Sequence, residues 1–185
     1  FSLRNVAWYV APTGSDDNTC DSPAAPCKTI GAAMAKALPG DTLFTAAGLY
    51  TGSEDFVVRV DRDISLSGGW DVDFDVQDGD SIIDGEGIRS GLSVPPGATV
   101  QVDHFVIQNA GNVDPGALEQ FGVACSGRLT LNNSAVRNNR RFGIYVRDAT
   151  GFLTMNNSSV SGNGEIGILI NWASEVILNN STVNG

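Results

Sequence analysis

Several features that mark common protein classes are scarce in this sequence of 185 residues. No apolar run approaches the roughly 20 residues that a membrane-spanning helix requires, so we expect no membrane span. Lysine and arginine number 11 against 21 acidic residues, and the net charge of −10 argues against nucleic acid as a partner. His104 is the only histidine, so the sequence supports neither a Ser-His-Asp site nor a zinc site of mixed Cys and His ligands.

Cysteine is also scarce, with three residues in the chain. Cys20 and Cys27 flank the short polar loop DSPAAP, and we interpret them as a local disulfide, with two free thiols as the alternative. Disulfides persist in oxidising compartments, so this interpretation predicts a secreted or cell-surface protein.

Glycine, asparagine and serine are abundant, and one asparagine-rich segment occurs three times with small changes. The stretches are LTLNNSAVRNN at 129–139, LTMNNSSVSGN at 153–163 and VILNNSTVNG at 176–185. A repeat in the low twenties with fixed apolar positions indicates a solenoid. Each repeat holds three short alternating runs separated by bends, which predicts three strands per turn of a parallel β-helix with coils about 4.8 Å apart.

The alternation of side chains along each strand assigns the core. We expect Cys125 to face inward in one column with Val94, Val146 and Ile170, and Tyr145 to face outward. In such a column Cys125 acts as a small buried hydrophobe, and a reactive thiol is the alternative.

The doubled asparagines fall at one sharp bend of each coil. Asparagine tolerates the left-handed backbone better than most residues, and stacked amides can form a hydrogen-bonded ladder. We prefer this ladder to the alternative that the NNS sequences are glycosylation sites. The asparagines in question are Asn132, Asn156, Asn179, Asn133, Asn157 and Asn180. His104 takes the position of Asn133 in an earlier coil, so we interpret it as a turn residue.

The N-terminal part differs from the repeats. We expect a strand in WYVAPTG and one helix in KTIGAAMAKAL, whose apolar face holds Ile30, Ala33, Met34, Ala37 and Leu38. A solenoid needs its first coil covered, so residues 1–40 are predicted to form a cap, and residues 41–185 the stacked coils of one domain. An insertion at 112–120 interrupts the repeats without specifying a ligand.

Three stretches resemble a known family. The segments WYVAPTGSDDNTCDSPAAPCKTIGAAMAKALPGDTLFTAAGLYTG, LSGGWDVDFDV and GATVQVDHFVIQNAGN are similar to the cap and opening coils of pectin-lyase-like, right-handed parallel β-helix proteins, including bacterial surface proteins related to polymorphic outer-membrane proteins. The resemblance implies an all-β fold: a right-handed, three-sheet parallel β-helix with an N-terminal helical cap. It says little about activity, because the family holds lyases, hydrolases, adhesins and structural proteins.

The lyases of this fold imply a site on the outward face of one sheet. The corresponding face here carries Ser93, Ala124, Tyr145 and Leu169, without the calcium-binding carboxylates that lyases use there. No catalytic residue of the family can be placed on this sequence, and we therefore expect a non-catalytic protein.

Two ligand sites are nevertheless predicted. Tyr145 and Trp172 could stack against sugar rings, with Arg141 and Arg147 binding acidic sugars; ordinary surface exposure is the alternative. The alternating Asp71, Asp73 and Asp75 suggest calcium, although they lack the EF-hand pattern, and a solvated acidic loop is the alternative. We expect no other cofactor.

The sequence thus predicts an extracellular structural or adhesive module. A carbohydrate-active enzyme, a glycan-binding module and a fragment of either are the alternatives. The chain stops partway through a repeat, so we expect the last coil to expose strand edges at Val176–Leu178 and Ser181–Val183. Self-association through this edge is a further expectation, with the N-terminal strand FSLRNVAWYV as donor.

Overall fold

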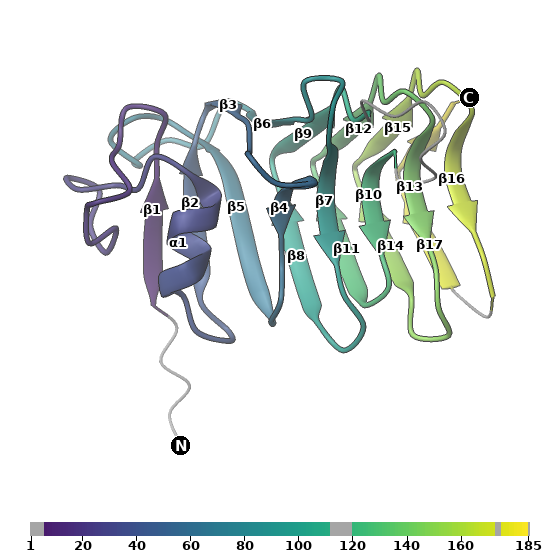
Figure 1. Ribbon diagram of the computed structural model, residues 1–185, viewed down its shortest axis with the longest axis horizontal. Coiled ribbons are helices and arrows are strands. Elements are labelled where there is room, and N and C mark those ends of the chain that lie inside the picture. The colour runs from purple at the N-terminus through teal and green to yellow at the C-terminus, as the bar shows by residue number, and fades with distance from the viewer. Residues whose placement is uncertain (1–5, 112–119, 173–174, 185) are drawn as a thin grey trace.

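The computed structural model describes residues 6–111, 120–172 and 175–184 of the chain. Three parallel sheets form the walls of a solenoid, and each complete turn contributes one strand to each wall (Figure 1). Sheet A consists of β1 (Ala7–Val10), β2 (Thr42–Ala46), β5 (Ile64–Trp70), β8 (Thr99–Asp103), β11 (Arg128–Asn132), β14 (Phe152–Asn156) and β17 (Glu175–Asn179).

The other two walls follow the same order along the axis. Sheet B consists of β3 (Gly48–Tyr50), β6 (Ser81–Asp84), β9 (Phe105–Gln108), β12 (Ala135–Arg137), β15 (Ser159–Ser161) and β18 (Thr182–Val183). Sheet C consists of β4 (Phe56–Arg59), β7 (Ser90–Val94), β10 (Phe121–Cys125), β13 (Phe142–Val146) and β16 (Ile166–Ile170). The parallel β-helix predicted from the repeat is therefore confirmed.

The register of the strands follows the repeat. Leu129 pairs with Leu153, which pairs with Val176, as the aligned lines predict. The predicted column of Val94, Cys125 and Val146 is fully buried, whereas Ile170 continues the column in register but is 49% exposed. No described residue stacks on Ile170 from the far side, so the apolar column ends in an exposed surface.

The asparagine bends also agree with the prediction. Asn133, Asn157 and Asn180 have φ values of 46°, 50° and 48°, and His104 shares this geometry at 57°. One amide row forms a ladder, in which Nδ2 of Asn179 donates to Oδ1 of Asn156 at 2.8 Å. Asparagine fits this bend because its side chain reaches a neighbour while its backbone tolerates positive φ.

The N-terminal cap holds a shorter helix than predicted. Helix α1 (Ile30–Lys36) begins at Thr29, whose hydroxyl accepts a 3.2 Å hydrogen bond from the Ala32 amide, and ends at Ala37, whose backbone is extended. Leu38 is 64% exposed, so its predicted place on the buried face was wrong. Pro39 explains the difference, because the residue before a proline avoids helical geometry.

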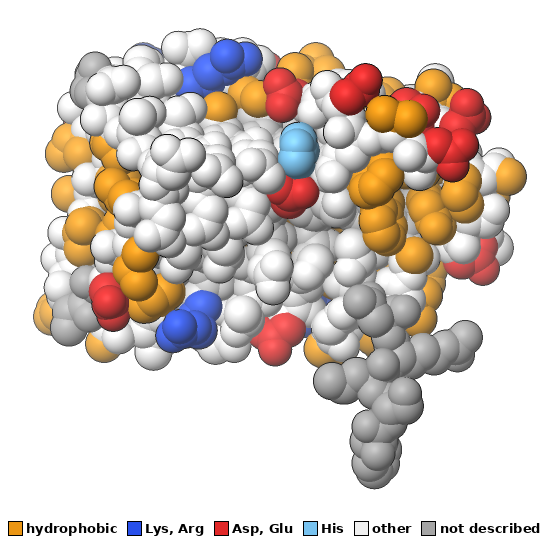
Figure 2. Space-filling view, turned by 180° about the vertical axis from the view of Figure 1, so that it is seen from behind, with side chains coloured by type: hydrophobic (Ala, Val, Ile, Leu, Met, Phe, Trp, Pro, Cys, Tyr) orange, Lys and Arg blue, Asp and Glu red, His pale blue; other side chains and the backbone are white. Residues whose placement is uncertain are grey.

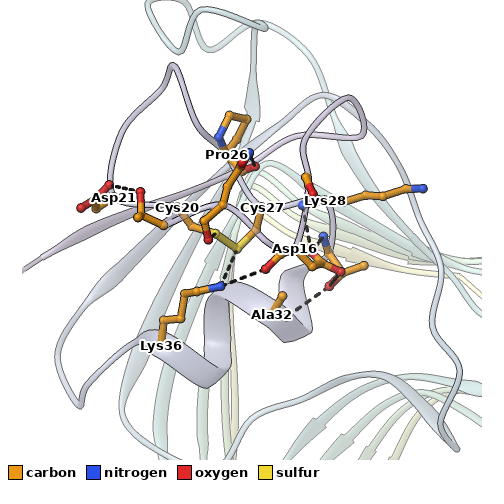
Figure 3. The surroundings of a disulfide bond; sticks show 12 residues. Asp16, Cys20, Asp21, Pro26, Cys27, Lys28, Ala32 and Lys36 are labelled. Carbon is orange, nitrogen blue, oxygen red and sulfur yellow. Dashed lines mark hydrogen bonds between the residues drawn. A yellow bond between two sulfur atoms is a disulfide. The ribbon is translucent and has the colours of Figure 1, made fainter.

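Cys20 and Cys27 form the predicted disulfide beside α1 (Figure 3). Both residues are fully buried, and the Lys36 ammonium lies 3.8 Å from Cys27 Sγ. The same ammonium donates to the Asp16 carbonyl at 3.2 Å, which ties the helix to the loop.

Strand β1 is not available as a donor strand, contrary to our expectation for FSLRNVAWYV. One edge of β1 pairs with β2, and the other meets the disulfide loop, where Tyr9 N–H donates to the Cys20 carbonyl at 2.7 Å. Residues 1–5 of the proposed donor, and 112–119 of the predicted insertion, lie outside the described residues. Among the described residues, no helix is long and apolar enough to cross a membrane.

Candidate functional site

The outward face of sheet C carries rows of side chains that run along the solenoid axis. Ser93, Ala124, Tyr145 and Leu169 form one such row in register, as predicted. Phe121 and Phe142 form part of a second row that the sequence analysis did not identify. Figure 1 shows this wall in front, with β4, β7, β10, β13 and β16 following one another across the view.

Glycines explain why these phenylalanines lie outside. Simple alternation from Val123 and Cys125 would turn Phe121 inward. A Cβ atom on Gly122 would lie 2.5 Å from Asn139 Nδ2 and 2.8 Å from Val136 Cγ1, so the position after Phe121 faces the core and has no room for a side chain. The recurrence of Phe-Gly in FGVAC and FGIYV was the sequence signal for this second row.

The aromatic rings of β10 and β13 contact one another directly. The centroids of Phe121 and Phe142 are 5.8 Å apart in a stacked arrangement, and those of Phe121 and Tyr145 are 5.1 Å apart. Phe121 and Ala124 are buried beneath the half-buried Phe142 and Tyr145, so this apolar cluster lies outside the main core.

An arginine lies at each end of the cluster. The Arg141 guanidinium carbon is 4.7 Å from the Phe142 centroid, and that of Arg147 is 6.0 Å from the Tyr145 centroid. We call Arg141, Phe142, Phe121, Tyr145 and Arg147 the arginine–aromatic row. It presents two cations and a continuous apolar surface on one wall of the solenoid.

Both arginines also have polar partners. Arg141 donates to both carboxylate oxygens of Glu165, at 2.6 and 3.0 Å, and this hydrogen bonding holds the pKa of Glu165 below its usual value. Arg147 donates to the Ser126 hydroxyl at 3.1 Å and lies 3.9 Å from an oxygen of Asp148. These contacts orient each guanidinium beside its ring.

The structure brings three of the four predicted glycan-binding residues together. Arg141, Tyr145 and Arg147 share the row, and the Tyr145 hydroxyl accepts a 3.2 Å hydrogen bond from Asn171. Trp172 follows Asn171 with a φ of 64° and is 79% exposed. Within the described part of the chain, its ring contacts no other aromatic ring.

The acidic loop that suggested calcium folds onto sheet A. Asp71 Oδ1 accepts hydrogen bonds from the amides of Asp75 and Val76, so part of its coordinating capacity serves the loop itself. Phe74 lies edge-on to Tyr9, with 5.0 Å between the ring centroids. Figure 2 shows hydrophobic side chains gathered on the surface near the N-terminal end of the solenoid. No group of three or more metal-ligating side chains is assembled among the described residues, and the calcium site at Asp71, Asp73 and Asp75 stays a prediction.

Cys125 and His104 lie away from the arginine–aromatic row. Burial raises the pKa of the Cys125 thiol to about 12, which favours the inert, buried role over the reactive one. His104 occupies the predicted bend, and its Nδ1 lies 3.0 Å from an Asp103 carboxylate oxygen at an angle unsuited to a hydrogen bond.

Comparisons with known proteins agree with this architecture. The model of the right-handed β-helix region family matches residues 77–185. No curated protein sequence matches the chain. The fold is similar to that of a GH136 lacto-N-biosidase from Eubacterium ramulus, with a TM-score of 0.64, 14% identity, and coverage of 96% of this chain and 41% of that one. A rhamnogalacturonan lyase is also similar, with a TM-score of 0.61, 10% identity, and coverage of 97% and 51%.

The two structures show the same fold, and the chain spans about half of their length or less. The family model covers more than half of this sequence, including every coil from β6 onward. With three parallel sheets and one strand per wall in each complete turn, the chain belongs to the right-handed parallel β-helix family.

Proposed function

We propose that this protein is an extracellular module that binds an acidic polysaccharide along the outward face of sheet C. The observation that carries the proposal is the arginine–aromatic row. Sugar rings stack their C–H faces on aromatic side chains, and the positive charge of guanidinium groups attracts the carboxylates of acidic sugars. The row offers both groups across the outward face of sheet C, because Arg141, Phe142, Tyr145 and Arg147 lie on β13 or directly beside it and Phe121 lies on the preceding coil.

The chemistry of the row favours binding over hydrolysis. A general acid for glycoside cleavage needs a carboxyl group whose pKa is raised, with a second carboxylate opposite it. Glu165 has the reverse property, because Arg141 lowers its pKa and keeps it ionised. The similar solved structures are carbohydrate-active enzymes, so an enzyme that uses further parts of a longer chain is the alternative.

The disulfide supports an extracellular location. The bond between Cys20 and Cys27 is buried in the cap, and such bonds are stable chiefly in oxidising compartments.

Titration calorimetry with an oligogalacturonate tests the binding proposal. We expect Tyr145→Ala to weaken binding roughly fivefold, which corresponds to the loss of about 1 kcal/mol of stacking and cation–π contact. Tyr9→Ala is the matched control, because it removes a half-buried ring from sheet A. Equal affinity for a neutral galactose oligomer, or equal losses in both variants, would contradict the proposal.

A structural role through end-to-end contact is the second candidate. The last coil exposes apolar side chains that other coils bury, namely Ile170 at 49%, Leu178 at 44% and Val183 at 39%. Analytical ultracentrifugation should then detect concentration-dependent association that Leu178→Lys abolishes. Ile88→Lys is the control, since Ile88 is equally exposed but precedes β7. A wild-type protein that stays monomeric at high concentration would reject this role.

A further inference from the structure

A second site lies at the bend where the chain passes from sheet C to sheet A. A groove of about 420 Å³ is bordered there by Arg128, Ala149, Thr150, Phe152 and Glu175, with three glycines completing its walls. The volume is within the range of pockets that hold small ligands. None of its lining residues belongs to the arginine–aromatic row.

Three side chains on successive coils define the chemistry of the groove. Arg128 pairs in register with Phe152, which pairs with Glu175, so a cation, an aromatic ring and a carboxylate follow one another along the axis. The Arg128 guanidinium carbon lies 4.2 Å from the Phe152 centroid. This is the shortest of the cation–ring distances, and the contact fixes the plane of the guanidinium.

Arg128 has no acidic partner among the described residues, a property it shares with Arg59, whose guanidinium carbon lies 5.0 Å from the Phe56 centroid. Arg62, Arg89 and Arg141 pair with Asp61, Glu86 and Glu165 respectively. Among residues 6–111, 120–172 and 175–184, no carboxylate lies within ion-pair distance of Arg128. The Arg128 guanidinium is exposed and is held in place by the Phe152 ring, with no anion beside it in the described part of the chain, although the net charge of the chain is −10. Its N–H donors are therefore available for a ligand.

The far side of the groove is lined by a carboxylate and therefore suits a different ligand group from the side lined by Arg128. Glu175 lies beyond Phe152 and is exposed, and the ring separates it from Arg128. A carboxylate accepts hydrogen bonds and donates none, so it matches hydroxyl donors. The Thr150 hydroxyl, which donates to the Ser126 carbonyl at 2.8 Å, has its own lone pairs left as acceptors.

We propose that this groove binds one uronic acid residue of an acidic glycan. The sugar carboxylate pairs with the Arg128 fork, its hydroxyls donate to Glu175 and Thr150, and its C–H groups contact the edge of Phe152. A uronate supplies an anion at one end, which matches Arg128, and hydroxyl donors at the other, which match Glu175. The site shares a ligand class with the proposed function but none of its residues, so either can fail alone.

Amide NMR with galacturonate as the probe tests the inference. The glycine amides of the walls report on the groove, and we expect Gly127 and Gly151 to shift on titration with the wild-type protein. Arg128→Gln should abolish these shifts, whereas Arg137→Gln, which removes an exposed arginine from β12 of sheet B, should leave them intact. Tyr145→Ala should also leave them intact, because it belongs to the other site.

A second variant distinguishes the loss of a ligand contact from a structural effect of Arg128→Gln. Ala149→Trp fills the groove from an exposed position without removing a charge, and it should block the shifts while the spectrum stays folded. Absence of shifts at millimolar galacturonate would overturn the proposal. So would equal shifts with galactose, which lacks the carboxylate, or with sulfate, which lacks the hydroxyl donors.

Discussion

The side-chain amide of Asn156 donates a 2.8 Å hydrogen bond to Oδ1 of Asn132 one coil before it. Asn179 donates to Asn156 in the same sense, so the amide donors of this ladder point toward the N-terminal coils. Asp103 precedes Asn132 in the row and accepts from the neighbouring Asn133 at 2.8 Å. A carboxylate suits this end because it can only accept.

A second, buried asparagine pair is expected to matter more for stability. Asn139 is 2% exposed, its Oδ1 accepts from the Ala110 amide at 2.9 Å, and its Nδ2 donates to Asn163 at 2.9 Å. Asn139→Leu leaves the buried Ala110 amide and Asn163 without these partners, so we expect a loss of about 1–3 kcal/mol in the free energy of unfolding. Urea denaturation measures it. Asn179→Ala, at an exposed ladder position, is the control and should cost less than half as much.

The strand register predicts opposite outcomes at two adjacent residues. Val146 is fully buried in the core column, whereas Tyr145 faces outward. Val146→Asp buries an unpaired charge and should prevent folding or lower the melting temperature severely. Tyr145→Asp should lower it only modestly, through the lost contact with Phe121. Comparable melting temperatures for the two variants would contradict the register.

These examples show which features the sequence could predict. The columns of Leu129, Leu153 and Val176 follow from a repeat that each coil imposes on the next by hydrogen bonding, so the fold, the register and the asparagine bends were predictable. The outward Phe121 and Phe142 were missed because the glycine after each phenylalanine takes the inward position, which breaks simple alternation. The contact between Phe74 and Tyr9 was missed because it joins residues from different coils, which no local pattern encodes.

The pKa of Glu165 should depend on Arg141. Hydrogen bonding to Arg141 lowers the pKa of Glu165 from its usual 4.5, so the ion pair is fully formed above that value and is lost as the pH falls through the lowered pKa. Carbon NMR of the side-chain carboxyl measures this titration. Arg141→Gln should raise the pKa of Glu165, and Arg147→Gln should leave it unchanged. An unaltered titration in Arg141→Gln would show that the pair does not persist in solution.

The three cysteines should differ in reactivity. Cys20 and Cys27 are joined, and Cys125 is a buried thiol whose pKa is raised to about 12. Alkylation of the native protein without reductant, followed by mass spectrometry, should therefore label no cysteine, because the thiolate is the reactive form. Denaturant should expose Cys125 alone, and reductant with denaturant all three. Replacing both Cys20 and Cys27 with alanine should lower the free energy of unfolding by about 2.5 kcal/mol, as expected for so short a loop. Labelling of Cys20 or Cys27 in the native, oxidised protein would contradict the disulfide and remove the main support for an extracellular location.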